Sequence, residues 1–111
     1  MSNSPECTVY PFWIQSKVID CAEPQIFQGR YPPKGWGANT ETVELYYAVK
    51  GDAVIHSRAV GIEKEYEIHP GEVYHFEKGE EYWVEVKSVE FRVLVVNSPP
   101  WTPDQYRISE E

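Results

Sequence analysis

The alternation of apolar and polar residues between Thr42 and Asn97 is typical of short β-strands. Segments rich in Val, Ile, Tyr and Phe are separated by the turn sequences "KGD", "VG", "HPGE", "EKGEE" and "KSVE", at intervals of roughly 8 to 12 residues. The run "VEFRVLVV" shows a period of two, with Glu90 and Arg92 expected on one face. The other face is expected to be core and carries Val89, Phe91, Val93 and Val95.

The segments between these candidate strands are too short for the crossovers that parallel strands require. No long stretch has apolar residues at helical spacing. The pattern therefore predicts an all-β, mostly antiparallel sandwich or barrel. With 111 residues, the chain is the size of one domain, and we expect a single domain over 1–111 with its core at about 25–97.

The two ends of the chain differ from this core. We expect an irregular N-terminal arm over 1–24, an edge strand over 25–28, and then a loop rich in Pro and Gly. In the tail, 98–111, Thr102 precedes Pro103 and stands three residues before Gln105, which is the pattern of a capped helix start. A short C-terminal helix is therefore expected, with Trp101 and Tyr106 pinning the tail to the body.

Charge and composition narrow the classes of partner. The net charge of −8 and the absence of a basic patch argue against nucleic acid, because phosphate binding depends on clustered Lys and Arg. No apolar run reaches the roughly 20 residues that cross a bilayer, so no membrane partner is expected. The start "MSNSPECTVYPFW" lacks the features of a signal peptide, which favours a cytoplasmic protein whose Cys7 and Cys21 are reduced thiols.

The strand "VELYYAVKG" carries a single acid, Glu44, on the same side as Tyr46 and Ala48. If that side faces the core, the carboxylate lies in the interior, where a charge must be paired or neutralised. Glu44 is therefore the first candidate for a functional group.

Two segments of the chain, "ELYYAVKG" and "HPGEVYHFEKGEEY", together resemble the signature motifs of the cupin family. Glu44 and Gly51 have the spacing of the Glu and Gly in the first motif, and Gly71 and Gly79 hold the two glycine positions of the second. The resemblance covers about residues 28–97. It implies an antiparallel jelly-roll, the double-stranded β-helix barrel of that family.

The metal ligands of the family are mostly missing from this chain. Of the four, only Glu44 is present, whereas divalent ions need three or four converging ligands. The remaining motif positions are occupied by Ala38 and Thr40 (or Gly37 and Asn39 at the other allowed spacing), Glu77, Tyr82 and Val86. We therefore expect no metal site of the family type and no other cofactor.

A metal site with different ligands is one alternative. Glu41, Glu44 and His75 could form it, because the short strand around His75 does not reveal which way that side chain faces. The same holds for His56, whereas His69 precedes a Pro-Gly turn and is expected to face water.

Without a metal, the resemblance places Tyr82 across the barrel from Glu44. A carboxyl that faces a phenol can exchange protons with a substrate as an acid and base pair, or it can form a plain hydrogen bond in a partly wet cavity. Trp83 is expected to face outward and to contribute to an interface. The candidate ligand-binding residues, taken from the loop at the barrel mouth and from the strands, are Arg30, Tyr31, Trp36, Asn39, Tyr46 and His75.

These residues support three hypotheses. The first is a protein that binds a sugar or another small polar organic molecule, expected to be a homodimer from family habit and from its aromatic content. The second is a metal-independent isomerase or epimerase in which Glu44 and Tyr82 are the catalytic acid and base, with His75 as a third candidate for the proton transfer. The third is a metalloenzyme with atypical ligands.

Overall fold

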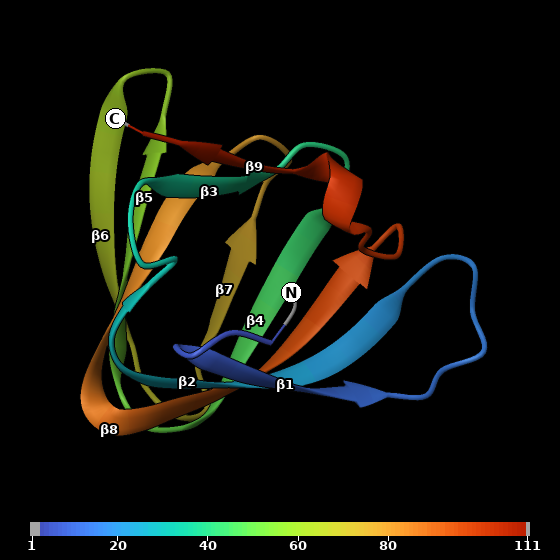
Figure 1. The fold of residues 1–111 in the computed structure, drawn as a ribbon, viewed down its shortest axis with the longest axis horizontal. Helices are drawn as coiled ribbons and strands as arrows, with labels where there is room; N and C mark the ends of the chain where they lie inside the picture. The colour runs from blue at the N-terminus through green and yellow to red at the C-terminus, as the bar shows by residue number, and fades with distance from the viewer. Residues whose placement is uncertain (1–2, 111) are drawn as a thin grey trace.

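The structure, a computed structural model, describes residues 3–110 as an antiparallel all-β protein (Figure 1). This confirms the predicted fold class. The strands are β1 (Cys7–Phe12), β2 (Asp20–Tyr31), β3 (Trp36–Asn39), β4 (Val43–Lys50), β5 (Ala53–Ala59), β6 (Ile62–Ile68), β7 (Val73–Phe76), β8 (Glu81–Ser98) and β9 (Tyr106–Ser109).

The long strand β8 connects the two walls of the barrel. Its first half pairs with β5 and with the end of β2, and its second half pairs with β4 and with the start of β2. Figure 1 shows a sharp bend between the halves. The inward positions change from even numbers to odd numbers across this bend, since the buried residues are Tyr82, Val84 and Val86, followed by Phe91, Val93 and Val95.

Val89 was expected to face the core with Phe91, and this prediction is wrong. It lies at the bend of β8 and is 81% exposed. A period-two pattern holds only while the strand is regular, so alternation counted backward from Phe91 fails where the strand bends.

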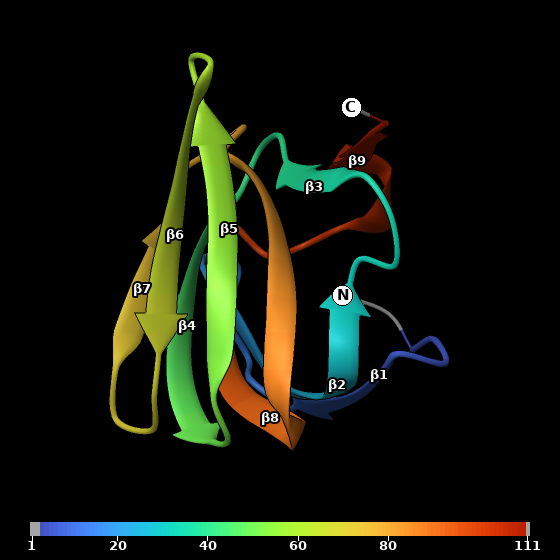
Figure 2. The same ribbon diagram turned by 90° about the vertical axis from the view of Figure 1, so that its left-hand side faces the viewer.

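The bend gives the barrel two walls with one open side between them. One wall contains β6, β5 and the first half of β8, and the other contains β7, β4 and the second half of β8. Among residues 3–110, β6 pairs only with β5 and β7 pairs only with β4. Figure 2 shows both edge strands on the same side of the barrel, and the rings of Tyr66 on β6 and Tyr74 on β7 meet between them.

The N-terminal arm is not irregular throughout, contrary to the prediction, although residues 13–19 form no strand. Strand β1 pairs with β2 in a continuous register from Cys7 opposite Ile26 to Phe12 opposite Cys21. The expected edge strand at 25–28 is therefore an inner part of β2, between β1 and β8. Short sequences with weak alternation gain their strand conformation from such long-range pairing. Both cysteines are free thiols.

The short C-terminal helix is also a wrong prediction. It is reduced to one 3-10 turn, η1 (Pro103–Gln105), and the Thr102 side chain makes no capping hydrogen bond. The chain then continues as β9, which pairs with β3 (Figure 1). Strand pairing satisfies the backbone groups of β3 on this side, which a helix could not do.

The tail is pinned as expected. The Trp101 indole N–H donates to the side chain of Asn39 at 2.8 Å, and the Gln105 amide donates to Thr42 at 2.6 Å. The Tyr106 ring packs against the core. In the described part of the chain, no helix has the length and apolar character needed to cross a membrane.

Candidate functional site

Glu44 lies inside the barrel, at the end that β3 and the tail cover. Its side chain is 1% exposed. The Asn39 amide N–H donates to the Glu44 carboxylate at 3.3 Å, while the Asn39 carbonyl accepts the Trp101 indole N–H at 2.8 Å. Because an amide carries its donor and acceptor on opposite sides, the Trp101 contact orients Asn39 to donate toward Glu44.

The surroundings make Glu44 easier to protonate than an ordinary glutamate. Burial raises its pKa from 4.5 to about 7, the hydrogen bond from Asn39 lowers it, and the charge of Asp20 raises it. At neutral pH the group is therefore divided between its acid and carboxylate forms. A carboxyl group in this state can accept or donate a proton.

Four tyrosines surround the same interior. Burial is the main cause that raises the pKa of Tyr31, Tyr46, Tyr82 and Tyr106, which remain neutral phenols at physiological pH. The Tyr82 hydroxyl lies 3.4 Å from the Tyr106 hydroxyl, and the Tyr46 hydroxyl has no partner among residues 3–110. No hydrogen bond in this part of the chain joins Glu44 to Tyr82, although both face the interior.

The tail closes this interior. Strand β9 lies so near β3 that a side-chain carbon at Gly37 would stand 2.1 Å from the Tyr106 hydroxyl. Glu44, Tyr46 and Tyr82 are each 1% exposed or less. A ligand could therefore contact Glu44 only if part of its surroundings moved, and the segment 101–109, whose Trp101 holds Asn39 against Glu44, is the part we expect to move.

Three of the candidate ligand-binding residues join this interior cluster, namely Tyr31, Asn39 and Tyr46. Trp36 is buried as well, but its ring is covered by the guanidinium of Arg58 at 4.4 Å. This cation–π contact accounts for Trp36 without a ligand.

Arg30 and His75 lie elsewhere. Arg30 is on the outer surface, where its guanidinium stacks 4.1 Å from the ring of Trp83 and donates to the Gly35 carbonyl. The other face of Trp83 stacks on His56 at 3.7 Å, so this outward-facing tryptophan is covered on both sides. His75 also points outward, is half-exposed and lies 3.5 Å from Glu77. The period of two places Tyr74 and Phe76, not His75, on the inner face of β7.

The residues do not fit a metal ion of the family type. Glu41 is exposed and His75 faces away from the barrel, so neither joins Glu44. Between residues 3 and 110, no group of three His, Cys, Asp or Glu side chains could hold an ion. The alternative prediction that Glu41, Glu44 and His75 bind a metal ion together is therefore wrong.

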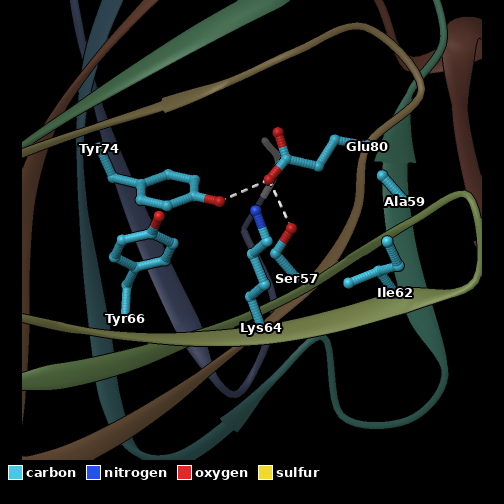
Figure 3. A pocket seen from close by; sticks show the side chains of 7 residues that line it. All are labelled: Ser57, Ala59, Ile62, Lys64, Tyr66, Tyr74 and Glu80. Atoms are coloured by element: carbon cyan, nitrogen blue, oxygen red, sulfur yellow. Dashed lines mark hydrogen bonds between the residues drawn. The ribbon is translucent and has the colours of Figure 1, made fainter.

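An open pocket lies between β6 and β7, and the sequence did not reveal it. It has a volume of about 240 Å³ and is lined by Ser57, Ala59, Ile62, Lys64, Tyr66, Tyr74 and Glu80 (Figure 3). The rings of Tyr66 and Tyr74 meet edge to face with their centroids 5.1 Å apart.

Glu80 is the most firmly held polar group of this pocket. One carboxylate oxygen accepts the Ser57 hydroxyl at 2.6 Å and the Tyr74 hydroxyl at 2.5 Å, as the dashed lines of Figure 3 show. The other oxygen accepts the backbone N–H of Glu77 at 2.8 Å. A carboxylate with three short donors is fixed in place before any ligand arrives.

Some signal for this pocket is present in the sequence. Ser57 continues the inward set of Ala53 and Ile55 on β5, and Lys64 and Tyr66 continue the inward set of Ile68 on β6. Polar residues at core-facing positions of an otherwise apolar face indicate a cavity. Glu80 carries no such signal, because it belongs to the "EKGEE" turn.

Comparison with known proteins gives similarity of structure only. No protein-family model matches the chain, and no curated protein matches it. A variant of PAC13 from Streptomyces with uridine aligns with a TM-score of 0.80 at 9% identity, covering 98% of this chain and 82% of that chain. Another Pac13 structure, with a TM-score of 0.79, is described as a unique nucleoside dehydratase.

Two further solved structures have the same fold. KdgF from Halomonas sp. aligns with a TM-score of 0.74 at 11% identity, covering 94% of this chain and 89% of that chain. Oxalate decarboxylase from Bacillus subtilis aligns with a TM-score of 0.75 at 13% identity, covering 84% of this chain and 24% of that chain. This chain has the cupin fold, as the two sequence motifs predicted.

Proposed function

We propose that the protein binds a small polar molecule in the pocket between β6 and β7. The observation that carries this proposal is the Glu80 carboxylate, held on the pocket wall by the hydroxyls of Ser57 and Tyr74. A concave site with a few fixed polar groups between aromatic rings is typical of small-molecule binding. The uridine in a PAC13 structure adds support, since that protein has the same fold.

The test is a screen of nucleosides, sugars, sugar phosphates and small organic acids by thermal shift, followed by ¹H–¹⁵N NMR. A ligand of the folded protein raises its melting temperature and should shift the amide signals of Ser57, Tyr74 and Glu80. We expect Glu80→Gln to weaken binding at least tenfold, because both carboxylate oxygens accept hydrogen bonds and the amide nitrogen of glutamine, a donor, must replace one of them. Glu63→Gln, at an exposed position on β6, is the matched control. Shifts confined to residues outside the pocket would contradict the proposal.

A second candidate is proton transfer at Glu44, as in an isomerase or epimerase that needs no metal. A buried acid with a pKa of about 7, in the same interior as the neutral Tyr82 phenol, favours it. The position of His75 on the outer surface removes that residue from the scheme. This alternative requires Glu44 to ionise near pH 7 and the segment 101–109 to open.

We also infer that the protein is a cytoplasmic homodimer without a nucleic-acid partner. The apolar side chains of Tyr10, Phe12 and Trp13 stand on β1 and just after it, and Trp13 is 92% exposed. Exposed aromatic residues that lie together favour a protein interface. Light scattering is expected to give twice the mass of one chain for the unaltered protein. The double variant with Phe12→Ser and Trp13→Ser is expected to have the mass of one chain. A single mass for the unaltered protein would contradict the dimer.

A further inference from the structure

The hydrogen bonds inside the pocket between β6 and β7 restrict which ligands fit it. Ser57 and Tyr74 each donate their only hydroxyl hydrogen to Glu80. Both hydroxyl oxygens and the carboxylate therefore offer lone pairs, and no hydrogen, to a ligand. A molecule on this wall must supply the donors itself.

Strand β6 supplies hydrogen-bond donors and a positive charge to the pocket. Lys64 lines the same pocket, and its ammonium carries three donors and a positive charge (Figure 3). Within residues 3–110, Lys64 forms no ion pair and no side-chain hydrogen bond, whereas Lys50 and Lys87 are paired with Glu90 and Glu85. The Tyr66 hydroxyl is the other side-chain donor of the pocket. An acceptor group or an anion of the ligand would lie on this side.

The size of the pocket sets a second limit. Its volume of about 240 Å³ is below the roughly 300 to 1,000 Å³ that is typical of sites for drug-sized ligands. The apolar side chains of Ala59 and Ile62 form part of the lining and need a nonpolar portion of the ligand, such as the C–H groups of a polyol.

We propose that the pocket binds a monosaccharide-sized anion that carries hydroxyl groups, with its anionic end on Lys64 and its hydroxyls donating to the wall of Glu80, Ser57 and Tyr74. This inference rests on the proposed function and names its ligand class. The anionic end is a carboxylate or a phosphate, and both satisfy an ammonium in the same way.

The experiment uses five six-carbon probes titrated into ¹⁵N-labelled full-length protein at pH 7.5. D-Gluconate and sorbitol 6-phosphate carry an anion and hydroxyls, sorbitol carries only hydroxyls, hexanoate only an anion, and glucosamine a cation with hydroxyls. We expect one or both anionic polyols to bind at least tenfold more tightly than the other three probes. Comparing D-gluconate with sorbitol 6-phosphate shows whether the pocket prefers a carboxylate or a phosphate. Binding should weaken as salt is raised, because the Lys64 contact is exposed to solvent.

Two variants locate the charge. Lys64→Gln should remove the tenfold advantage of the anionic polyols and leave sorbitol unchanged, whereas Lys34→Gln, in the exposed turn between β2 and β3, should change neither. Equal binding of sorbitol, hexanoate or glucosamine, or full affinity in Lys64→Gln, would overturn the ligand class. If any of the five probes still shifts the amide signals of Ser57 and Glu80 in that case, the proposed small-molecule binding stands and only the ligand class is wrong. If no probe and no screened compound shifts these signals, both the proposed binding function and the ligand class are wrong.

Discussion

Replacing Glu44 with glutamine is expected to make the protein more stable above pH 7 and to flatten the dependence of its unfolding free energy on pH. Burial raises the pKa of Glu44 to about 7 in the folded protein, against 4.5 in the unfolded chain. The folded state therefore binds more protons between these two values, and stability falls as the pH rises through them. The difference corresponds to about 3 kcal/mol.

At both ends of this pH range Glu44 has the same protonation state in the folded and the unfolded protein. Below pH 4.5 Glu44 is protonated in both states, so burial of the neutral acid carries no ionic cost. Above pH 7 it is ionised in both states, and within residues 3–110 the buried carboxylate accepts a side-chain hydrogen bond from Asn39 alone. Glutamine keeps the acceptor for Asn39 and cannot ionise.

Urea unfolding of both proteins between pH 4 and pH 9 measures this effect. The unfolding free energy of Glu44→Gln minus that of the unaltered protein should rise by about 3 kcal/mol across the range. Taking the difference removes the contributions of groups common to both proteins, such as His69 and Glu90. A flat difference would show that Glu44 ionises normally, and it would also remove the basis for proton transfer at this site.

Replacing Gly51 with alanine is expected to destabilise the protein by roughly 3 kcal/mol or more, because it combines two costs. Gly51 has a φ of +86°, which costs an L-residue about 1 to 2 kcal/mol. A side-chain carbon there would also lie 2.1 Å from the backbone oxygen of Glu90, in the bend of β8. Forcing the bend outward adds about 1 to 3 kcal/mol.

Gly61→Ala separates these two costs. Gly61 has a similar φ of +75°, but a side-chain carbon there would meet no atom within 4 Å. We expect this control to lose only about 1 kcal/mol. Equal losses in the two variants, measured by urea unfolding, would mean that the turn after β4 does not pack against β8 as the structure shows.

The motif residues were the part of the fold that the sequence made predictable. Glu44 and Gly51 are set by local requirements, since one needs a strand position that faces the core and the other a positive φ beside a neighbouring backbone. The same holds for Phe91, Val93 and Val95, whose alternation lies within one regular segment. Such features depend on a few adjacent residues and are visible in the chain itself.

Other elements depend on partners far away in the sequence. Strand β1 exists because it pairs with β2, and β9 exists because it pairs with β3, although Thr102 and Pro103 favour a helix start there. Val89 was misplaced because the bend of β8 changes which positions face inward. Pairing and bends of this kind override local preference, and one sequence does not display them.

The residues of the candidate site also differ in whether the sequence alone predicts their position. The inward direction of Glu44, Tyr46 and Tyr82 followed from alternation and from the family motifs. Arg30 and His75 were misplaced because each is one position out of phase with an inward neighbour, Tyr31 and Phe76 respectively. The part that Glu80 plays in the pocket could not be predicted, because it depends on how a turn folds back onto two strands.

The absence of backbone pairing between β6 and β7 in the described chain has a mechanical consequence. Strand β5 is hydrogen-bonded to β8, whereas β6 and β7 are joined across this seam by side-chain contacts such as that of Tyr66 with Tyr74, so the seam can adjust without loss of backbone pairing between these two strands. An unpaired edge of this kind invites aggregation with other chains, and Glu63, Lys64, Glu65 and Glu67 place charges along it that discourage such pairing. The same strand thus lines the pocket with Ile62, Lys64 and Tyr66 and discourages edge-to-edge pairing with its charges.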